Sequence, residues 1–180
     1  YEEIKRDITI GITNGVSGYI RINGEIAAFA SLIDVADVCI SPLKDVVNDK
    51  LEAYERVMNS IFMIIKDSHP RKSALYFQYI VTKNKYANFT LASDLVNAGG
   101  RLALENGCKY LYAIPINKIA ESFEKKWTHS IICEINLDLI KFGETYPFEG
   151  IDFKIPLIMY DIEKVRDKIE LNVEFKNPAL

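Results

Sequence analysis

The chain has 180 residues, with 22 Lys or Arg and 25 Asp or Glu, so its formal net charge is −3 at pH 7. This length is typical of one globular domain, and a hydrophobic content of 49% argues against disorder. We expect a cytoplasmic protein without nucleic-acid or membrane partners, because Lys and Arg form no basic stripe and no apolar run could span a bilayer or act as a signal peptide.

The N-terminal residues precede a predicted β-hairpin. Over residues 1–13 the pattern fits either a strand, because isoleucines alternate at 8, 10 and 12, or the end of a helix that stops at Asn14-Gly15. The next two β-rich runs, Ser17–Ile22 and Glu25–Val35, flank Asn23-Gly24. Asn-Gly between two such runs predicts a tight hairpin, because both central residues of its turn need a positive φ.

A long amphipathic helix is predicted from Asp45 to Asp67 and ends before His69-Pro70. Apolar residues at helical spacing are expected to form its core face, and they are Val47, Leu51, Tyr54, Met58, Ile61 and Ile65.

The stretch from Ser73 to Asn106 is the centre of the chain. Leu75–Val81 is rich in aromatic and β-branched residues and predicts a strand. After a polar break, Leu91, Leu95, Ala98 and Leu102 recur on one helical face, and Gly107 follows as a C-terminal stop. A strand that leads through a short loop into a helix is a ready anion site, since the first-turn N–H groups are unpaired and the helix dipole adds positive potential.

The remaining elements follow in short succession. We expect a strand at Lys109–Ile114, a helix at Ile116–Lys126, a half-exposed strand from Ile131 to Leu139, and a last strand at Phe153–Tyr160 that is broken or bulged near Pro156. Residues 163–180 form a charged tail with a short apolar alternation. This tail either docks as an edge strand or lies free.

Few side chains carry obvious chemistry. The three cysteines, Cys39, Cys108 and Cys133, have no metal-ligand spacing, so we expect reduced thiols and no metal site. The two histidines, at 69 and 129, fall at a helix end and a strand start, where a structural role is favoured. Glu134 is a base or simply a solvated carboxylate.

This order of elements, with the segment Asn117-x-x-Ala120-x-x-Phe123 after the fourth strand, resembles the core of the GCN5-related N-acetyltransferase (GNAT) family. The loop Tyr146-Pro147-Phe148 makes the animal arylalkylamine-type and nematode-expanded members the most similar. The likeness covers Ser17 to Lys164. It implies an α/β (α+β) fold with a mixed, mostly antiparallel central sheet and helices on both faces. It also implies one domain over residues 1–164, in which the family's N-terminal strand and helices are missing, and a tail over 165–180.

The resemblance implies that acetyl-CoA is a substrate and that a small amine is the acceptor. The family's glycine-rich loop pattern falls on Ala87–Ala92, where only Ala92 fits it. The implied coenzyme A contacts are main-chain amides on the loop, the polarising amides of the preceding strand, and one side chain that could equally be a helix cap. They are Asn88, Phe89, Thr90, Leu91 and Ala92, then Ile80 and Val81, and finally Asn117.

Two functions stay open at this point. One is an acyl-CoA-dependent N-acetyltransferase that works by direct transfer in a ternary complex, and a homodimer is left open for it. The other is a catalytically impaired GNAT-fold binding or assembly module. The second is favoured by Phe123, because the family's general acid at that position is a tyrosine. The catalytic residues are therefore left unassigned.

Overall fold

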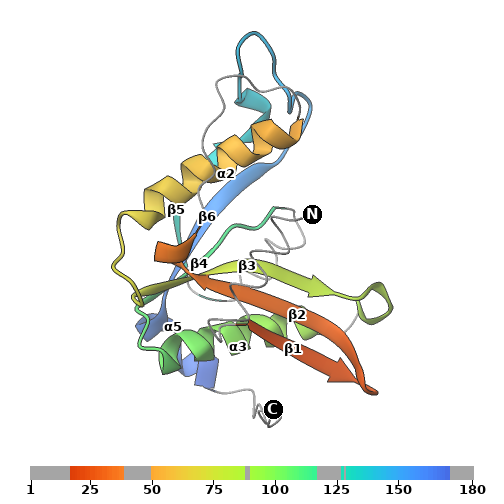
Figure 1. Cartoon of the computed structure of the whole chain (residues 1–180), viewed down its shortest axis with the longest axis vertical. Helices are drawn as coiled ribbons and strands as arrows, with labels where there is room; N and C mark the ends of the chain where they lie inside the picture. The colour runs from red at the N-terminus through yellow and green to blue at the C-terminus, as the bar shows by residue number, and fades with distance from the viewer. Residues whose placement is uncertain (1–16, 39–49, 88–89, 117–126, 128, 171–180) are drawn as a thin grey trace.

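In the computed structural model, one sheet carries helices on both of its faces (Figure 1). The structure describes residues 17–38, 50–87, 90–116, 127 and 129–170. Within these, the strand order is β1-β2-β3-β4-β6-β5, and every neighbouring pair is antiparallel except β3 with β4. The expected α/β (α+β) class with a mixed, mostly antiparallel sheet is confirmed. The described elements are β1 (Ser17–Ile22), β2 (Glu25–Asp34), η1 (Val35–Asp37), α2 (Lys50–Lys66), β3 (Ala74–Thr82), η2 (Asn84–Tyr86), α3 (Leu91–Glu105), β4 (Tyr110–Ala113), β5 (Ser130–Asn136), η3 (Leu137–Leu139), β6 (Lys154–Asp161) and α5 (Ile162–Glu170).

The β1–β2 hairpin forms as predicted. Asn23 and Gly24 connect the two strands with φ angles of 52° and 83°. Both values are positive, as a two-residue hairpin turn requires. The local sequence therefore sets the register of the first two strands.

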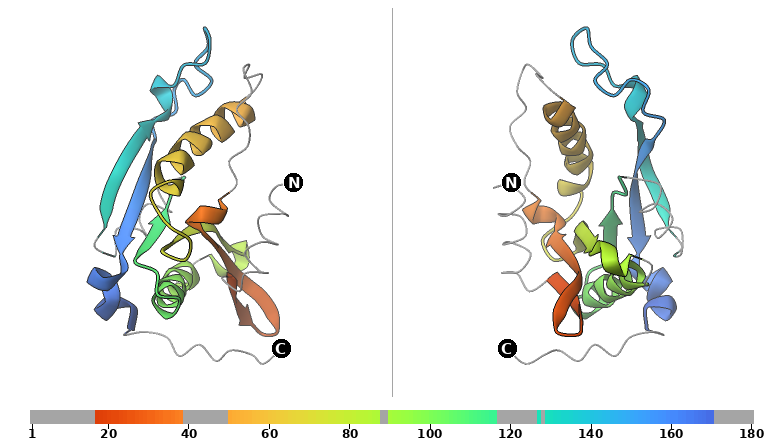
Figure 2. Two further views of the ribbon diagram at one scale, coloured as in Figure 1. Left: turned by 60° about the vertical axis from the view of Figure 1, so that its left-hand side comes forward. Right: turned by 90° about the vertical axis from the view of Figure 1, so that its right-hand side faces the viewer.

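Two hydrophobic clusters lie on opposite faces of the sheet. Leu32 and Ile33 are neighbours in β2 but belong to different clusters, as do Leu111 and Tyr112 in β4. This alternation is expected because successive strand residues point to opposite faces. Helices α3 and α5 cover one face and α2 covers the other (Figure 2).

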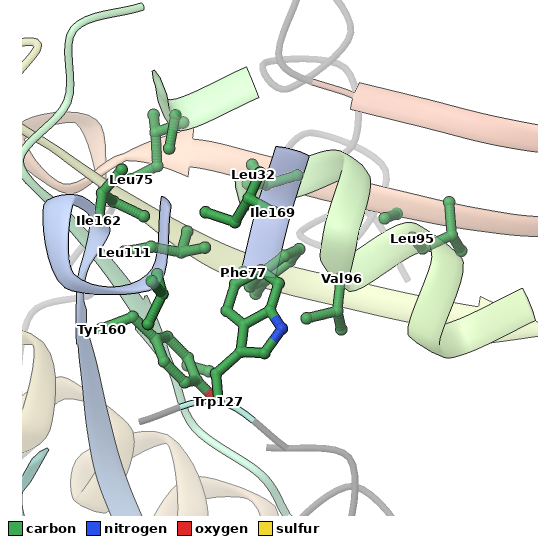
Figure 3. Close-up of a cluster of buried hydrophobic side chains, with 14 of the residues drawn as sticks. Leu32, Leu75, Phe77, Leu95, Val96, Leu111, Trp127, Tyr160, Ile162 and Ile169 are labelled. Atoms are coloured by element: carbon green, nitrogen blue, oxygen red, sulfur yellow. The ribbon is translucent and has the colours of Figure 1, made fainter. Parts of the chain in front are cut away.

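The cluster beneath α3 and α5 is closely packed (Figure 3). It joins sheet residues to side chains of both helices and to Trp127. The ring of Trp127 meets that of Tyr160 edge to face, with centroids 5.4 Å apart. The sticks labelled in Figure 3 are Leu32, Leu75, Phe77, Leu95, Val96, Leu111, Trp127, Tyr160, Ile162 and Ile169.

The predicted core face of the second helix was partly wrong. Leu51 was expected to be buried, but it is exposed, and the fully packed stripe of α2 includes Ala53, Val57, Ile61 and Ile65. The two candidate stripes share Ile61 and Ile65. The helix is rotated toward its smaller residues, which lets it approach the sheet closely.

The predicted strand from Ile131 to Leu139 was too long. Strand β5 ends at Asn136, whose side-chain oxygen accepts a hydrogen bond of 3.2 Å from the Asp138 N–H and starts the short helix η3. An Asx side chain that bonds the backbone two residues ahead turns the chain. Leu139 consequently lies exposed rather than on the sheet.

Strand β6 is not broken at Pro156, contrary to expectation. Pro156 pairs with Glu134, and the irregularity lies in β5 between Ile131 and Cys133. Strand β4 pairs with β6 only from Ile158 to Asp161, so Pro156 lies beyond it. The missing N–H of proline is tolerated when it faces a side without a ladder partner.

The start of the predicted tail is a helix. Residues 162–170 form α5, and Ile162, Val165 and Ile169 are buried against the sheet and α3. The expectation of an edge strand or a free segment was therefore wrong for these residues, and the expected boundary at 164/165 falls inside α5. The apolar alternation beyond Ile169 lies outside the described residues.

Several other expectations also fall outside the described residues. They concern residues 1–16, the N-terminal part of the predicted helix before Lys50, the helix predicted at 116–126 apart from Ile116, and Cys39. Among the described residues, Cys108 and Cys133 are unpaired thiols, no group of His, Cys, Asp or Glu could hold a metal ion, and no helix has the length and apolarity needed to cross a membrane.

Candidate functional site

Strands β3 and β4 separate soon after they meet. Their parallel pairing joins Ala74 to Tyr110 and ends at Tyr76 with Tyr112. Beyond Tyr76, β3 continues to Thr82 with β2 as its described strand partner. The sheet therefore opens between β3 and β4, and no described strand pairs with the edge of β3 that β4 leaves.

A bulge in β3 lies at the start of this opening. Ser31 pairs with Tyr79, but the next β2 residue, Leu32, pairs with Phe77, so Gln78 is an extra residue in β3. Such bulges bend a strand and redirect its groups, and they are frequent next to binding sites.

The two predicted polarising amides face different ways. The Lys83 N–H donates to the Ala27 carbonyl at 2.9 Å, which fixes the phase of the antiparallel ladder. By alternation, the N–H of Val81 points toward β2, whereas that of Ile80 points toward the open edge. Ile80 is therefore placed to offer a main-chain donor there, and the Val81 side chain is exposed.

Helix α3 begins at the same end of the sheet. It connects two parallel strands, so its N-terminus lies at the end of β3 toward which the strands separate. Thr90 is the N-cap residue with φ −74° and ψ 14°, and its side chain bonds no first-turn amide. The first N–H groups of a helix have no intrahelical acceptor. Those of Leu91 and Ala92 are thus available as donors by the geometry of the helix.

The bulk of Leu91 does not cover this helix start. Its side chain is only 7% exposed and belongs to the cluster under α3, while Thr90 is exposed and Ala92 half-buried. Asn88, Phe89 and Asn117, the other predicted coenzyme A contacts, lie outside the described residues. Their roles remain predictions.

A carboxylate lies in the first turn of α3. The Thr90 hydroxyl donates to Asp94 Oδ2 at 3.3 Å, and the Asp94 N–H donates to the Thr90 carbonyl at 3.0 Å. The negative charge complements the positive end of the helix dipole, and it repels any anion bound there. The expected assistance of Thr90 is thus directed to Asp94, a residue to which the sequence analysis gave no role.

A second carboxylate holds the segment that leads into α3. Glu25 accepts hydrogen bonds from Tyr86 Oη at 2.7 Å and Lys83 Nζ at 3.2 Å, and it also contacts Lys85. The Lys85 bond, followed by those of Tyr86 and Lys83, lowers the pKa of Glu25 to about 2. Helix η2 is thereby tied to the β1–β2 hairpin without glycine. The Lys-x-Lys spacing after β3 was the sequence signal for this clasp.

The glycines of this region lie within α3 rather than before it. A Cβ on Gly99 would lie 2.3 Å from Phe77 Cζ, and one on Gly100 would lie 2.5 Å from Trp127 Cη2. These positions let α3 approach β3 and Trp127 at backbone distance. The two glycines therefore set the height of the helix, and with it the position of its first turn.

The candidate proton-handling groups have structural partners. His69 Nε2 lies 2.6 Å from the hydroxyl of Tyr112, and the Nδ1 of His129 donates to the Trp127 carbonyl at 2.9 Å. Glu134 is an exposed carboxylate 4.0 Å from Lys154 Nζ. Burial raises the pKa of the Cys108 thiol, which favours its unreactive form. None of these groups gains an assigned catalytic role.

No protein-family model and no curated protein matches this sequence. Solved structures do match. The C-terminal condensation domain of Ebony, in complex with β-alanyl-dopamine, aligns with a TM-score of 0.76 at 12% identity over 88% of this chain and 78% of that chain. Arylalkylamine N-acetyltransferase 2 from Aedes aegypti aligns at 0.66 and 13% identity, over 90% of this chain and 80% of that one.

A third match is the polyamine N-acetyltransferase from Drosophila melanogaster, with a TM-score of 0.70 at 8% identity over 87% of this chain and 79% of that chain. Identities this low establish a shared fold and not a shared activity. Together with the open β3–β4 edge and the helix that follows β3, they identify the chain as having the fold of the GCN5-related N-acetyltransferases, with arylalkylamine-type enzymes among its structural neighbours.

Proposed function

We propose that this protein is an acyl-CoA-dependent N-acetyltransferase that transfers an acetyl group directly to a small amine in a ternary complex. The observation that carries the proposal is the opening of the sheet beyond Tyr76 and Tyr112, with the Ile80 amide on its edge and the start of α3 at the same end. The named acceptors of the structural neighbours, which are arylalkylamines, agmatine and polyamines, support an amine as the acceptor.

Each main-chain feature has a part in the proposed reaction. The N–H groups of Leu91 and Ala92 would bind the diphosphate of coenzyme A. The Ile80 N–H would donate to the thioester oxygen, where negative charge develops. The amine nitrogen forms the new C–N bond while the C–S bond breaks. The nitrogen loses one proton, and the departing thiolate ends as a thiol with one proton gained.

A second candidate is a GNAT-fold module without catalysis. It is favoured by the Asp94 carboxylate in the first turn of α3, which opposes anion binding, and by the absence of glycine between Ala87 and Ala92. Such a module binds coenzyme A weakly or not at all. The Ebony neighbour, described as a condensation domain, supports a use of this fold outside acetyl transfer.

The two candidates are separated by binding and turnover measured on the same sample. Millimolar acetyl-CoA should raise the melting temperature, because a ligand that binds only the native state stabilises it. ATP serves as the control, since it offers phosphates without the pantetheine thioester. Release of free thiol in the presence of 2-phenylethylamine, agmatine or spermidine would support the enzyme. A shift without thiol release supports the module, and no shift rejects coenzyme A binding.

A further inference from the structure

Ser31 is a buried polar residue in the middle of the β1–β2–β3 sheet. It is 0% exposed, and its hydroxyl donates to Gln78 Oε1 at 3.3 Å while it accepts from Ser17 Oγ at 3.5 Å. Burial of a hydroxyl is costly unless it is hydrogen-bonded, and here two partners satisfy it. The result is a polar row across three strands that ends at Gln78, the bulge residue of β3.

An apolar row runs beside it on the same face. Tyr19 pairs with Phe29 and Phe29 with Val81, each two residues further along its strand than Ser17, Ser31 and Tyr79. Residues two apart in a strand share a face. Tyr19 is 42% and Val81 57% exposed, so this row is open to solvent.

Both rows lie on the face opposite α3. Ala28, Ala30 and Leu32, which alternate with Phe29 and Ser31, belong to the cluster under that helix. In β3, Ile80 lies between Tyr79 and Val81, so its amide faces the open edge beside both rows. A molecule that rests on this face can therefore approach the site of the proposed thioester from the side away from α3.

The charge around this face is positive. Neither row contains a carboxylate, and the guanidinium of Arg21 lies over the Tyr19 ring at 5.3 Å from its centroid. Glu25, at the hairpin end of β2, is already bonded to Lys83 and Tyr86. A second positive charge on a ligand would find no described acidic partner in these two rows.

We propose that this face selects the acceptor, and that it takes a primary amine with one charge and an apolar, ring-sized body in preference to a polyamine. The inference rests on the proposed function. Gln78 Oε1 has two lone pairs, of which Ser31 uses one, so the other can accept a hydrogen bond from the amine N–H. The body packs on Tyr19, Phe29 and Val81. Ser31 is a positioning residue that holds the Gln78 amide.

The test compares two probes, 2-phenylethylamine and spermidine, by calorimetric binding to the full chain with and without coenzyme A. Val81→Glu is the first variant, because an exposed side chain tolerates a charge. It should weaken 2-phenylethylamine binding by about tenfold and strengthen spermidine binding. Ile131→Glu is the matched control, since Ile131 is 52% exposed on β5 and the charge change is identical. That control should leave both affinities unchanged.

Gln78→Leu tests the polar contact, and it should weaken 2-phenylethylamine binding by about tenfold at an unchanged coenzyme A affinity. The double variant Gln78→Leu, Ser31→Ala removes the unpaired hydroxyl and serves if the single variant is unstable. If wild type binds spermidine better, or if Val81→Glu and Ile131→Glu act alike, the inference is overturned. Failure of coenzyme A to bind overturns the proposed function alone, because amine binding is measured without it as well.

Discussion

His69 and Tyr112 form a short hydrogen bond between the loop after α2 and strand β4, with His69 Nε2 2.6 Å from the Tyr112 hydroxyl. Burial lowers the pKa of His69 below its ordinary 6.5, and it raises the pKa of Tyr112 to about 12. Both groups are therefore neutral in the native protein near pH 7. Ionisation of either one is easier in the unfolded chain.

The first prediction concerns stability at acid pH. Below pH 6.5 the unfolded chain binds a proton at residue 69 more readily than the native protein does, so the free energy of unfolding should fall as the pH decreases. His69→Gln should flatten this part of the profile in urea titrations. His129→Gln, which alters the histidine bonded to the Trp127 carbonyl, is the control and should keep it. An equal slope in both variants would exclude His69 as the cause.

The second prediction concerns the close approach of α3 to β3. Gly99→Ala places a methyl group 2.3 Å from Phe77 Cζ, so the ring or the helix must shift, at a cost of about 1–3 kcal/mol. Phe77→Leu should recover part of that loss in the double variant. Gly18→Ala is the control, because its Cβ would meet nothing within 4 Å. Chemical denaturation of the four proteins measures the effect, and additive losses in the double variant would contradict it.

The third prediction concerns the carboxylate at the start of α3. Asp94→Asn removes a negative charge from the first turn, so coenzyme A should bind about twofold to fivefold more tightly if its diphosphate occupies that turn. Glu105→Gln makes the same change in net charge at the other end of the same helix. That control should leave the affinity unchanged in calorimetry at low salt. An equal gain in both variants would show only a general charge effect.

The fourth prediction concerns the main-chain donors. Ala92→Pro removes a first-turn N–H that makes no intrahelical bond, and proline is tolerated in the first turn. Acetyl-CoA binding should weaken by about tenfold or more while the melting temperature changes little. Glu163→Pro makes the same change in the first turn of α5 and should not affect binding. Undiminished affinity in Ala92→Pro would remove the diphosphate from this helix start.

Local signals in the sequence predicted much of the fold. Asn23-Gly24 encodes a turn that few other pairs adopt, and Gly107, with φ 69°, ends α3 as expected. The packed face of α2 could not be predicted this way. Two overlapping stripes share Ile61 and Ile65, and only the depth of the neighbouring sheet decides between them.

The site was predictable only where it depends on chain order. Strand, loop and helix place the Ile80 amide and the first turn of α3 at one end, and that could be inferred from periodicity. The clasp around Glu25 could not, because Glu25 and Tyr86 are 61 residues apart and meet only through the tertiary pairing of β2 with β3. Asp94 is a surface residue in the sequence pattern, and its effect follows from the helix boundary.

The loss of β4 as a neighbour leaves the outer half of β3 with one described lateral support. That support is β2, and the Lys83–Ala27 bond and the Glu25 clasp fasten the two at their tips. Hairpin and outer strand must therefore swing as a single lever when either is pushed. Amide hydrogen exchange along residues 78–82 and 25–30 should then slow in concert on ligand entry, and the mechanical hinge should lie where Tyr76 meets Tyr112.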